Sequence, residues 1–363
     1  ESTQAYITFI QDIEPQISVQ LNALSKKLLE SKMFPVYERN HTLQTMILKN
    51  EVDLFREENV SLFAEIHQEE QEFGVIASKM TINHDGKELP LPQTAIYLQD
   101  NDRAVREEVY KKLVQRRVVD IDSLNNLLSS LIRKRYHVAY NAGFINFRDY
   151  QHRNLNRFDY SPQDLIELYR VIEHEVCSLV DEILEHRRTV LGVDKLKPWD
   201  LEVDIYGREP LVPFKSIQEL INAAEKCLFE IDPEIGELFN ILTQEGYLDL
   251  ESRKGKAPGG FNYPLYETNR SFIFMNASGR MKDFEVLVHE MGHAYHAYLC
   301  GSLPLFEYKW TPMEVAELSS MAIELFSVDH WHSILPSEDM VNRARLNLIE
   351  DAIVSLPWIA AID

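Results

Sequence analysis

Apolar residues recur at helical spacing along most of this chain. The clearest stripe, near the start, comprises Phe9, Ile13, Ile17, Leu21, Leu24 and Leu28. Spacings of three and four residues place side chains on one face of a helix. The pattern predicts helices from Ala5 to about Ile76, from Asp102 to His186, and again from Ser216.

Two segments depart from this helical pattern. Asp85-Gly86 lies between short apolar runs and predicts a hairpin near residues 80–92. Phe272–Asn276 is an apolar run of the length and composition of a strand. A strand at a sheet edge there could pair with an extended peptide. We therefore expect a mainly α fold with a small β element.

Composition and charge narrow the class of protein. Hydrophobic residues make up 45% of the chain and charged residues 26%, as in folded globular proteins. The net charge of -21 argues against nucleic-acid binding. The three cysteines, Cys177, Cys227 and Cys300, lack a CxxC spacing, which favours a reducing compartment. Without a membrane-length apolar run or a signal-peptide pattern, we expect a cytoplasmic protein with no membrane partner. The sequence does not indicate an oligomeric state.

The segment His289-Glu290-Met291-Gly292-His293 carries the strongest chemical signal. It lies in the amphipathic run Phe284–Leu299, which ends before Gly301, so a helix is predicted. Residues four apart share a helix face, so both imidazoles can bind one ion with Glu290 beside it. The segment predicts a zinc hydrolase site in which Glu290 is the catalytic base.

A catalytic zinc ion needs a third protein ligand and one open position. Two carboxylates, Glu314 and Glu317, lie in the next predicted helix, Pro312–Glu324, and the residues alone leave both open. A third histidine ligand six residues after the motif would require Gly at 296 and His at 299. Those positions hold His296 and Leu299, so that class of site is excluded.

The zinc motif together with Glu317–Glu324 resembles the oligoendopeptidase F branch of the thimet oligopeptidase (M3) family of zinc metallopeptidases. Arg253–Phe261 and Ser271–Gly279 resemble the glycine-rich loop and strand that precede the zinc helix in that family. Weaker similarity elsewhere extends the resemblance over most of the chain.

The resemblance implies one zinc ion bound by His289, His293 and Glu317, with Glu290 as the catalytic base. Glu324 would either hold a ligating imidazole or lie on a solvated face. The fold expected is a large helical zincin-type peptidase body with a cleft. The residues expected to bind substrate are Gly259, Gly260, Asn276, Ala277 and Gly279.

The implied function is zinc-dependent hydrolysis of internal peptide bonds in short oligopeptides. A related helical zinc carboxypeptidase and a catalytically incomplete peptide-binding fragment are the alternatives. We expect a helical region over 1–190, a linker-like segment over 191–215 and a zinc-binding catalytic region over 216–363. Because the chain starts without Met and stops within an apolar pattern, we expect a longer polypeptide. In the family, His and Tyr residues that stabilise the oxyanion would follow beyond Asp363.

Overall fold

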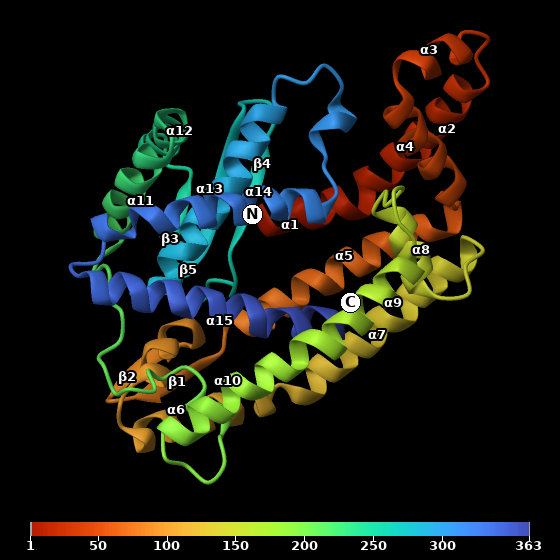
Figure 1. Cartoon of the computed structure of the whole chain (residues 1–363). Coiled ribbons are helices and arrows are strands. Elements are labelled where there is room, and N and C mark those ends of the chain that lie inside the picture. Colours follow the sequence, from red (N-terminus) through yellow and green to blue (C-terminus); the bar gives the residue numbers. More distant parts are fainter. Residues whose placement is uncertain (1, 363) are drawn as a thin grey trace. The chain divides into compact units, whose positions relative to one another are not determined.

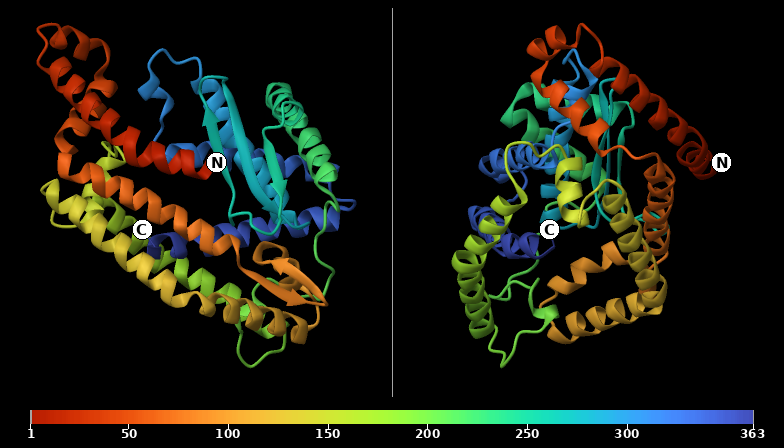
Figure 2. Two further views of the ribbon diagram at one scale, coloured as in Figure 1. Left: turned by 180° about the vertical axis from the view of Figure 1, so that it is seen from behind. Right: turned by 90° about the vertical axis from the view of Figure 1, so that its right-hand side faces the viewer.

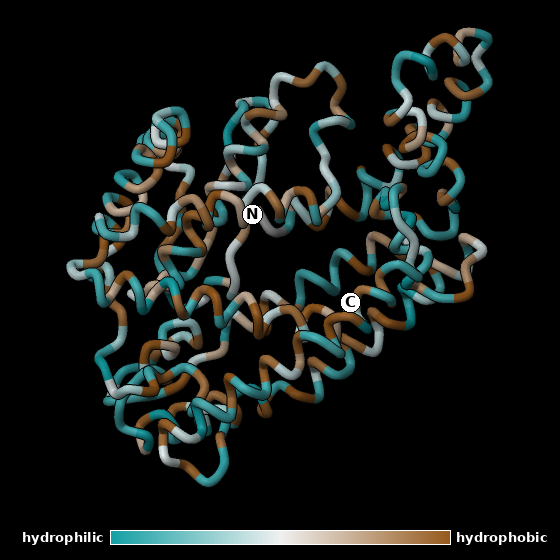
Figure 3. The backbone as a smooth tube through the Cα atoms, in the orientation of Figure 1, coloured by the Kyte–Doolittle hydropathy of each residue, from teal (hydrophilic) through white to brown (hydrophobic). Residues whose placement is uncertain are grey.

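The computed structural model describes residues 2–362, and most of them are helical (Figure 1). Apolar and polar positions alternate along the long helices (Figure 3). The α-helices are α1 Ser2–Thr8, α2 Glu14–Leu29, α3 Phe34–Asn40, α4 Thr42–Leu54, α5 Glu57–Ser78, α6 Arg103–Val119, α7 Ile121–Asn141, α8 Phe147–Asn154, α9 Pro162–Val171, α10 Cys177–Val190, α11 Ile217–Ile231, α12 Pro233–Gln244, α13 Met281–Cys300, α14 Met313–Ser327 and α15 Glu338–Ile362.

The strands and short helical turns complete the described chain. The strands are β1 Thr81–His84, β2 Lys87–Pro90, β3 Leu248–Glu251, β4 Phe261–Leu265 and β5 Arg270–Ala277. The turns are η1 Phe9–Ile13, η2 Leu91–Gln99, η3 Ile172–Val176, η4 Pro198–Asp200, η5 Phe306–Lys309 and η6 Val328–Ser333. The predicted mainly α fold with a small β element is therefore confirmed.

The chain forms two compact units, and the first comprises the residues up to Ile76 together with Asp120–Leu165. Its core is a cluster of apolar side chains from α4, α5, α7 and α8, including Ile66, Leu131 and Val138. The buried Asn59 amide donates to the Val138 carbonyl over 2.9 Å, which satisfies its polar group inside the core. The stripe predicted near the start is helical, but its side chains are exposed.

The second unit comprises Ala77–Val119 and the described residues from Ile166 onward. The predicted hairpin is present, since β1 pairs antiparallel with β2 around Asp85 and Gly86. A second sheet has the strand order β3-β5-β4, with its three strands side by side in Figure 2. β5 therefore lies in the centre, parallel to β3 and antiparallel to β4.

Alternate residues of β5 point into the largest core of the second unit. Ile273 and Met275 pack there with Phe284, Leu287 and Met291 of α13. α13 follows β5 in the chain and contacts β5, β4 and α14 (Figure 1). The sheet and α14 thus hold the helix that carries the predicted zinc motif.

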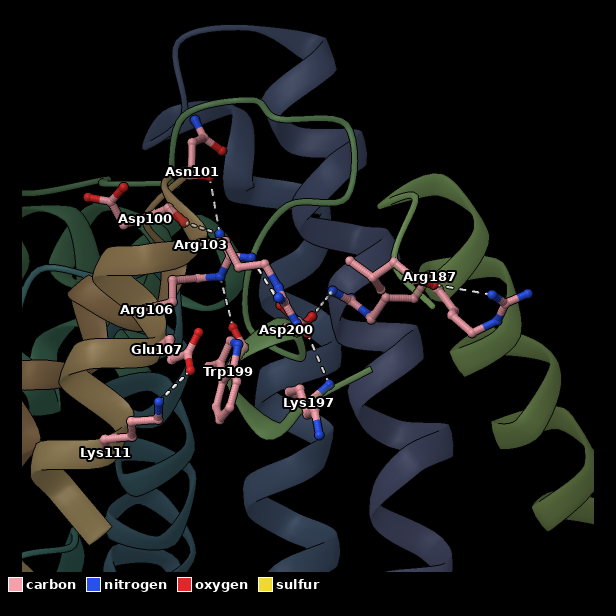
Figure 4. Close-up of polar contacts among 12 residues, drawn as sticks. Asp100, Asn101, Arg103, Arg106, Glu107, Lys111, Arg187, Lys197, Trp199 and Asp200 are labelled. Atoms are coloured by element: carbon pink, nitrogen blue, oxygen red, sulfur yellow. Dashed lines mark hydrogen bonds and ion pairs between the residues drawn. The ribbon is translucent and has the colours of Figure 1, made fainter. Parts of the chain in front are cut away.

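The segment over 191–215 is irregular apart from η4, and it is anchored to α6. Asp200 is fully buried, and its carboxylate accepts hydrogen bonds from Arg103 over 2.8 and 2.9 Å and from Arg106 over 3.2 Å (Figure 4). Arg106 also donates to the Trp199 carbonyl over 2.8 Å. Two cations beside one buried carboxylate hold the pKa of Asp200 below its usual value despite its burial. The expected division into a helical region before this segment and a catalytic region after it stays a prediction.

No helix among residues 2–362 combines the length and apolar character required to cross a bilayer.

Candidate metal centre and active site

The helix predicted for the segment with the zinc motif is confirmed as α13, and Asp283 secures its first turn. Its Oδ2 atom accepts hydrogen bonds from the backbone N–H groups of Ser278, Gly279 and Arg280 over 2.7, 2.9 and 3.0 Å. A carboxylate in this position also interacts favourably with the positive end of the helix dipole. Asp283 therefore fixes both the start of α13 and the turn that leads into it.

Gly292, inside the motif, allows α14 to approach α13 closely. A Cβ atom at residue 292 would lie 2.6 Å from the Ser320 Cα and 3.2 Å from the Ser319 carbonyl oxygen. Real side chains do not tolerate such a contact with backbone, so only glycine fits. Ser320 is fully buried at this contact. The close approach brings the carboxylate of Glu317, one turn before Ser320, to the histidine face of α13.

Three donor groups meet where the two helices approach. His289 Nε2 lies 3.3 Å from Glu317 Oε2, and His293 Nε2 lies 3.6 Å from Glu317 Oε1. One ligand atom from each of the three residues falls within 4.8 Å of the others. Within residues 2–362 this is the only such group of three or more His, Cys, Asp or Glu side chains. Neither Glu314 nor His296 belongs to it.

Each ring also contacts a group outside this set of three. His289 Nδ1 contacts Glu324 Oε1, and the His293 ring lies beside the Ala316 backbone. Such outer contacts fix the orientation of an imidazole and the tautomer that it adopts. The pair Glu324–His289 thus favours the first of the two roles considered for Glu324.

The Glu290 carboxyl group is buried beside these donors. The residue is 6% exposed, and its Oε2 atom has no hydrogen-bond partner among the described residues. The backbone of Asn262, in β4, lies beside the same carboxyl group and favours its ionised form. Burial, together with the charges of Glu317 and Glu324, raises the pKa of Glu290 to about 7.

The surroundings shift the pKa values of the two histidines in opposite directions. Burial alone would lower the pKa of His289, but the hydrogen bond to Glu324 and the nearby carboxylates outweigh it and raise that pKa. Burial and the neighbouring His289 lower the pKa of His293. Carboxylates therefore lie at both nitrogens of His289, with Glu324 at Nδ1 and Glu317 at Nε2.

The residues predicted to bind substrate differ in how close they lie to Glu290 and to the histidines. Gly260 reaches Glu290, since a Cβ atom there would lie 3.4 Å from Glu290 Oε1. Gly259, at φ +98°, adopts a conformation that favours glycine, and its carbonyl accepts from the Asn276 amide over 2.9 Å. Ala277 is buried. Gly279 lies before α13, whose first residue, Met281, is about 12 Å along the helix from His289 at 1.5 Å per residue.

The predicted strand is confirmed within β5, but it is not an edge strand. β4 and β3 flank it, and β4 lies at the sheet edge beside Glu290. β4 was not predicted from the sequence, and it contains Pro264. Proline lacks a backbone N–H and is tolerated at sheet edges, so it weakens a strand pattern without excluding an edge strand.

Comparison with known proteins agrees with this geometry. The model of Peptidase family M3 matches residues 96–355. An oligoendopeptidase F homolog of Borreliella burgdorferi is 24% identical over 351 residues, covering 94% of this chain and 54% of that protein. Oligopeptidase PepF of Bacillus subtilis is 22% identical over 323 residues, covering 85% of this chain and 46% of that protein.

Solved structures share the fold over nearly the whole chain. PZ peptidase A, solved with an inhibitor, superposes with a TM-score of 0.93 at 23% identity, covering 99% of this chain and 63% of that one. An X-ray structure of a candidate oligoendopeptidase F gives the same TM-score, identity and coverage. The chain spans about half the length of the curated relatives that it matches. Since the family model matches well over half of its residues, the chain belongs to peptidase family M3.

Proposed function

We propose that this chain carries the zinc centre of a metalloendopeptidase that hydrolyses internal bonds of short peptides. One observation carries the proposal: ligand atoms of His289, His293 and Glu317 converge within 4.8 Å. Membership of family M3 supports peptide-bond hydrolysis as the reaction class. The names of the matched relatives, oligoendopeptidase F and oligopeptidase, support short peptides as substrates.

The donor set suits zinc. Two imidazole nitrogens and one carboxylate are a common ligand set of catalytic zinc, and three protein ligands leave one coordination position open. Glu324 engages His289 Nδ1, which leaves Nε2 directed at Glu317. A bound zinc ion supplies Lewis acidity, which favours attack of water on a peptide carbonyl.

Glu290 is proposed as the general base. Its buried carboxyl group has one oxygen without a hydrogen-bond partner among the described residues, so that oxygen can accept the proton of an attacking water. The same group can then return a proton to the leaving amine. The Asn262 backbone of β4 lies beside the carboxyl group and forms one side of its surroundings.

The edge strand β4 is proposed to bind the substrate backbone. It pairs with β5 on one side only, and Asn262 of β4 lies at Glu290. An extended peptide can hydrogen-bond to a free strand edge without regard to its sequence. Phe261 and Tyr263 are exposed on this strand and are available to substrate side chains. This role replaces the one expected for the central strand β5.

The test combines zinc stoichiometry with cleavage of an internally quenched peptide blocked at both ends. We expect one zinc per chain and cleavage that a chelator abolishes. Cleavage only of peptides with a free carboxyl terminus would favour the related carboxypeptidase. Zinc binding without any cleavage would favour an incomplete peptide-binding fragment, and a folded chain that takes up no zinc would contradict the metal site.

A further inference from the structure

Lys256 is a buried lysine that the proposed chemistry does not use. Its side chain is 2% exposed, and Nζ donates to the Asp249 carbonyl over 2.9 Å, to Asp249 Oδ1 over 3.0 Å and to the Glu251 carbonyl over 2.9 Å. The Met275 carbonyl is a fourth acceptor that shares the three N–H groups, and Nζ lies 4.3 Å from the centre of the Phe274 ring. One ammonium group thus joins β3 to β5.

The lysine belongs to the loop over 252–260, which β5 holds at two successive residues. Met275 accepts from Lys256, while the Asn276 amide donates to the carbonyls of Ala257 and Gly259 over 2.9 Å each. The contacts fall at the middle and the end of the loop. These hydrogen bonds therefore restrict the backbone conformation of the residues that follow Gly259.

Those following residues form one wall around the Glu290 carboxyl group. A Cβ atom at Gly260 would be in van der Waals contact with Glu290 Oε1 at 3.4 Å, and the Asn262 backbone lies beside the same carboxyl group. A shift of the loop would therefore move both of these neighbours relative to the carboxyl group. Residues 257–262 connect Lys256 to Asn262, and Ala257, Gly259, Phe261 and Asn262 are each bonded to or paired with β5.

We propose that Lys256 is a positioning residue for Glu290, acting through the loop that ends at Gly260. The inference rests on the proposed function of Glu290 as general base. Charge-assisted hydrogen bonds are stronger and more directional than neutral ones, so an ammonium group holds the loop more firmly than an apolar side chain would. Removing it would also leave buried carbonyl groups unpaired.

Lys254 offers a matched control in the same loop. Its side chain is 63% exposed, and its Nζ pairs with Glu88 Oε1 over 2.7 Å. Exposed ion pairs of this kind contribute little to stability. Lys254→Met and Lys256→Met thus make the same change of charge two residues apart, and only the second removes a buried contact.

The experiment compares the full chain with both variants by hydrogen exchange of residues 257–263, zinc stoichiometry and cleavage of the blocked quenched peptide over a range of pH. We expect Lys256→Met to bind zinc normally, to exchange faster in this segment, and to lose about tenfold in kcat with a smaller change in KM. The acidic limb of its pH profile should shift. Lys254→Met should match the parent chain in every measurement.

Unchanged exchange and unchanged kcat in Lys256→Met would overturn the inference. A parent chain that binds zinc but cleaves nothing would instead contradict the proposed function, while exchange would still report whether Lys256 holds the loop. If Lys256→Met fails to fold, Lys256→Gln removes the charge while retaining a polar side chain. Normal exchange of residues 257–263 together with unchanged kcat in that variant would also contradict the proposal.

Discussion

Gly292 and Ser320 lie in direct backbone contact, because a Cβ atom at residue 292 would come within 2.6 Å of the Ser320 Cα. This contact sets the separation of α13 and α14, the two helices that supply the donor atoms. His289 and His293 depend only on the geometry of α13, whereas Glu317 depends on where α14 lies. The position of the proposed third ligand, Glu317, therefore depends on a glycine that is not itself a proposed ligand.

Gly292→Ala tests this relationship. The added methyl group must push α14 away from α13, and we expect a loss of about 1–3 kcal/mol of stability, as for other overpacked sites. We also expect weaker zinc binding, because Glu317 moves away from both imidazoles. Chemical denaturation without zinc and a competitive zinc titration measure the two effects. Unchanged zinc affinity would show that the contact does not position Glu317.

Glu317→Gln and Glu314→Gln form a matched pair on α14. Both substitutions remove one negative charge, but only Glu317 approaches the imidazole nitrogens. We expect Glu317→Gln to lose more zinc affinity than the roughly 10–100-fold that outer contacts contribute. Glu314→Gln should retain zinc. Equal losses in the two variants, measured by competition with a chelator of known affinity, would contradict the assignment.

Glu290→Gln tests the proposed role of Glu290 as general base separately from the binding of zinc. The amide preserves the shape of the side chain but cannot take a proton from water. We expect stoichiometric zinc and at least about a 100-fold lower kcat, which is the usual scale of general-base catalysis. His293→Ala, as the comparison, should lose both zinc and turnover. Full activity in Glu290→Gln would remove Glu290 from the mechanism.

The lowered pKa of Asp249, which lies outside the proposed metal centre, predicts that the stability of the fold depends on pH. Its hydrogen bond with Arg253, together with Lys256, lowers its pKa from 3.8 to about 2 despite partial burial. A pKa lower in the folded state stabilises the fold above the ordinary value, and this contribution disappears as the pH falls from 3.8 towards 2. The difference corresponds to at most about 2.5 kcal/mol.

We therefore expect Asp249→Asn to be less stable than the parent chain at pH 7, with the gap closing near pH 2. Urea unfolding at several pH values measures the difference. Glu251→Gln, in the same strand, changes an exposed carboxylate and is the control. A gap that stays constant with pH would mean that the ionised carboxylate of Asp249 does not contribute.

Local patterns predicted much of this molecule. The helix of the zinc motif, the hairpin over 81–90 and the strand within β5 follow from periodicity and turn residues, which act over a few neighbouring positions. The missed strands illustrate the limit of such patterns. β3 has only four residues and β4 contains Pro264, so neither carries a clear strand signal.

The sequence by itself determined that His289 and His293 share one helix face, because a spacing of four residues and the pitch of a helix are local properties. Only the tertiary structure decided what lies opposite that face. The approach of α14 at Gly292 brings Glu317 to the two rings, and the sheet order places Asn262 of β4, rather than a residue of β5, at Glu290. These contacts join residues far apart in the chain through packing and strand pairing. Neither can be predicted from the spacing of residues in the sequence.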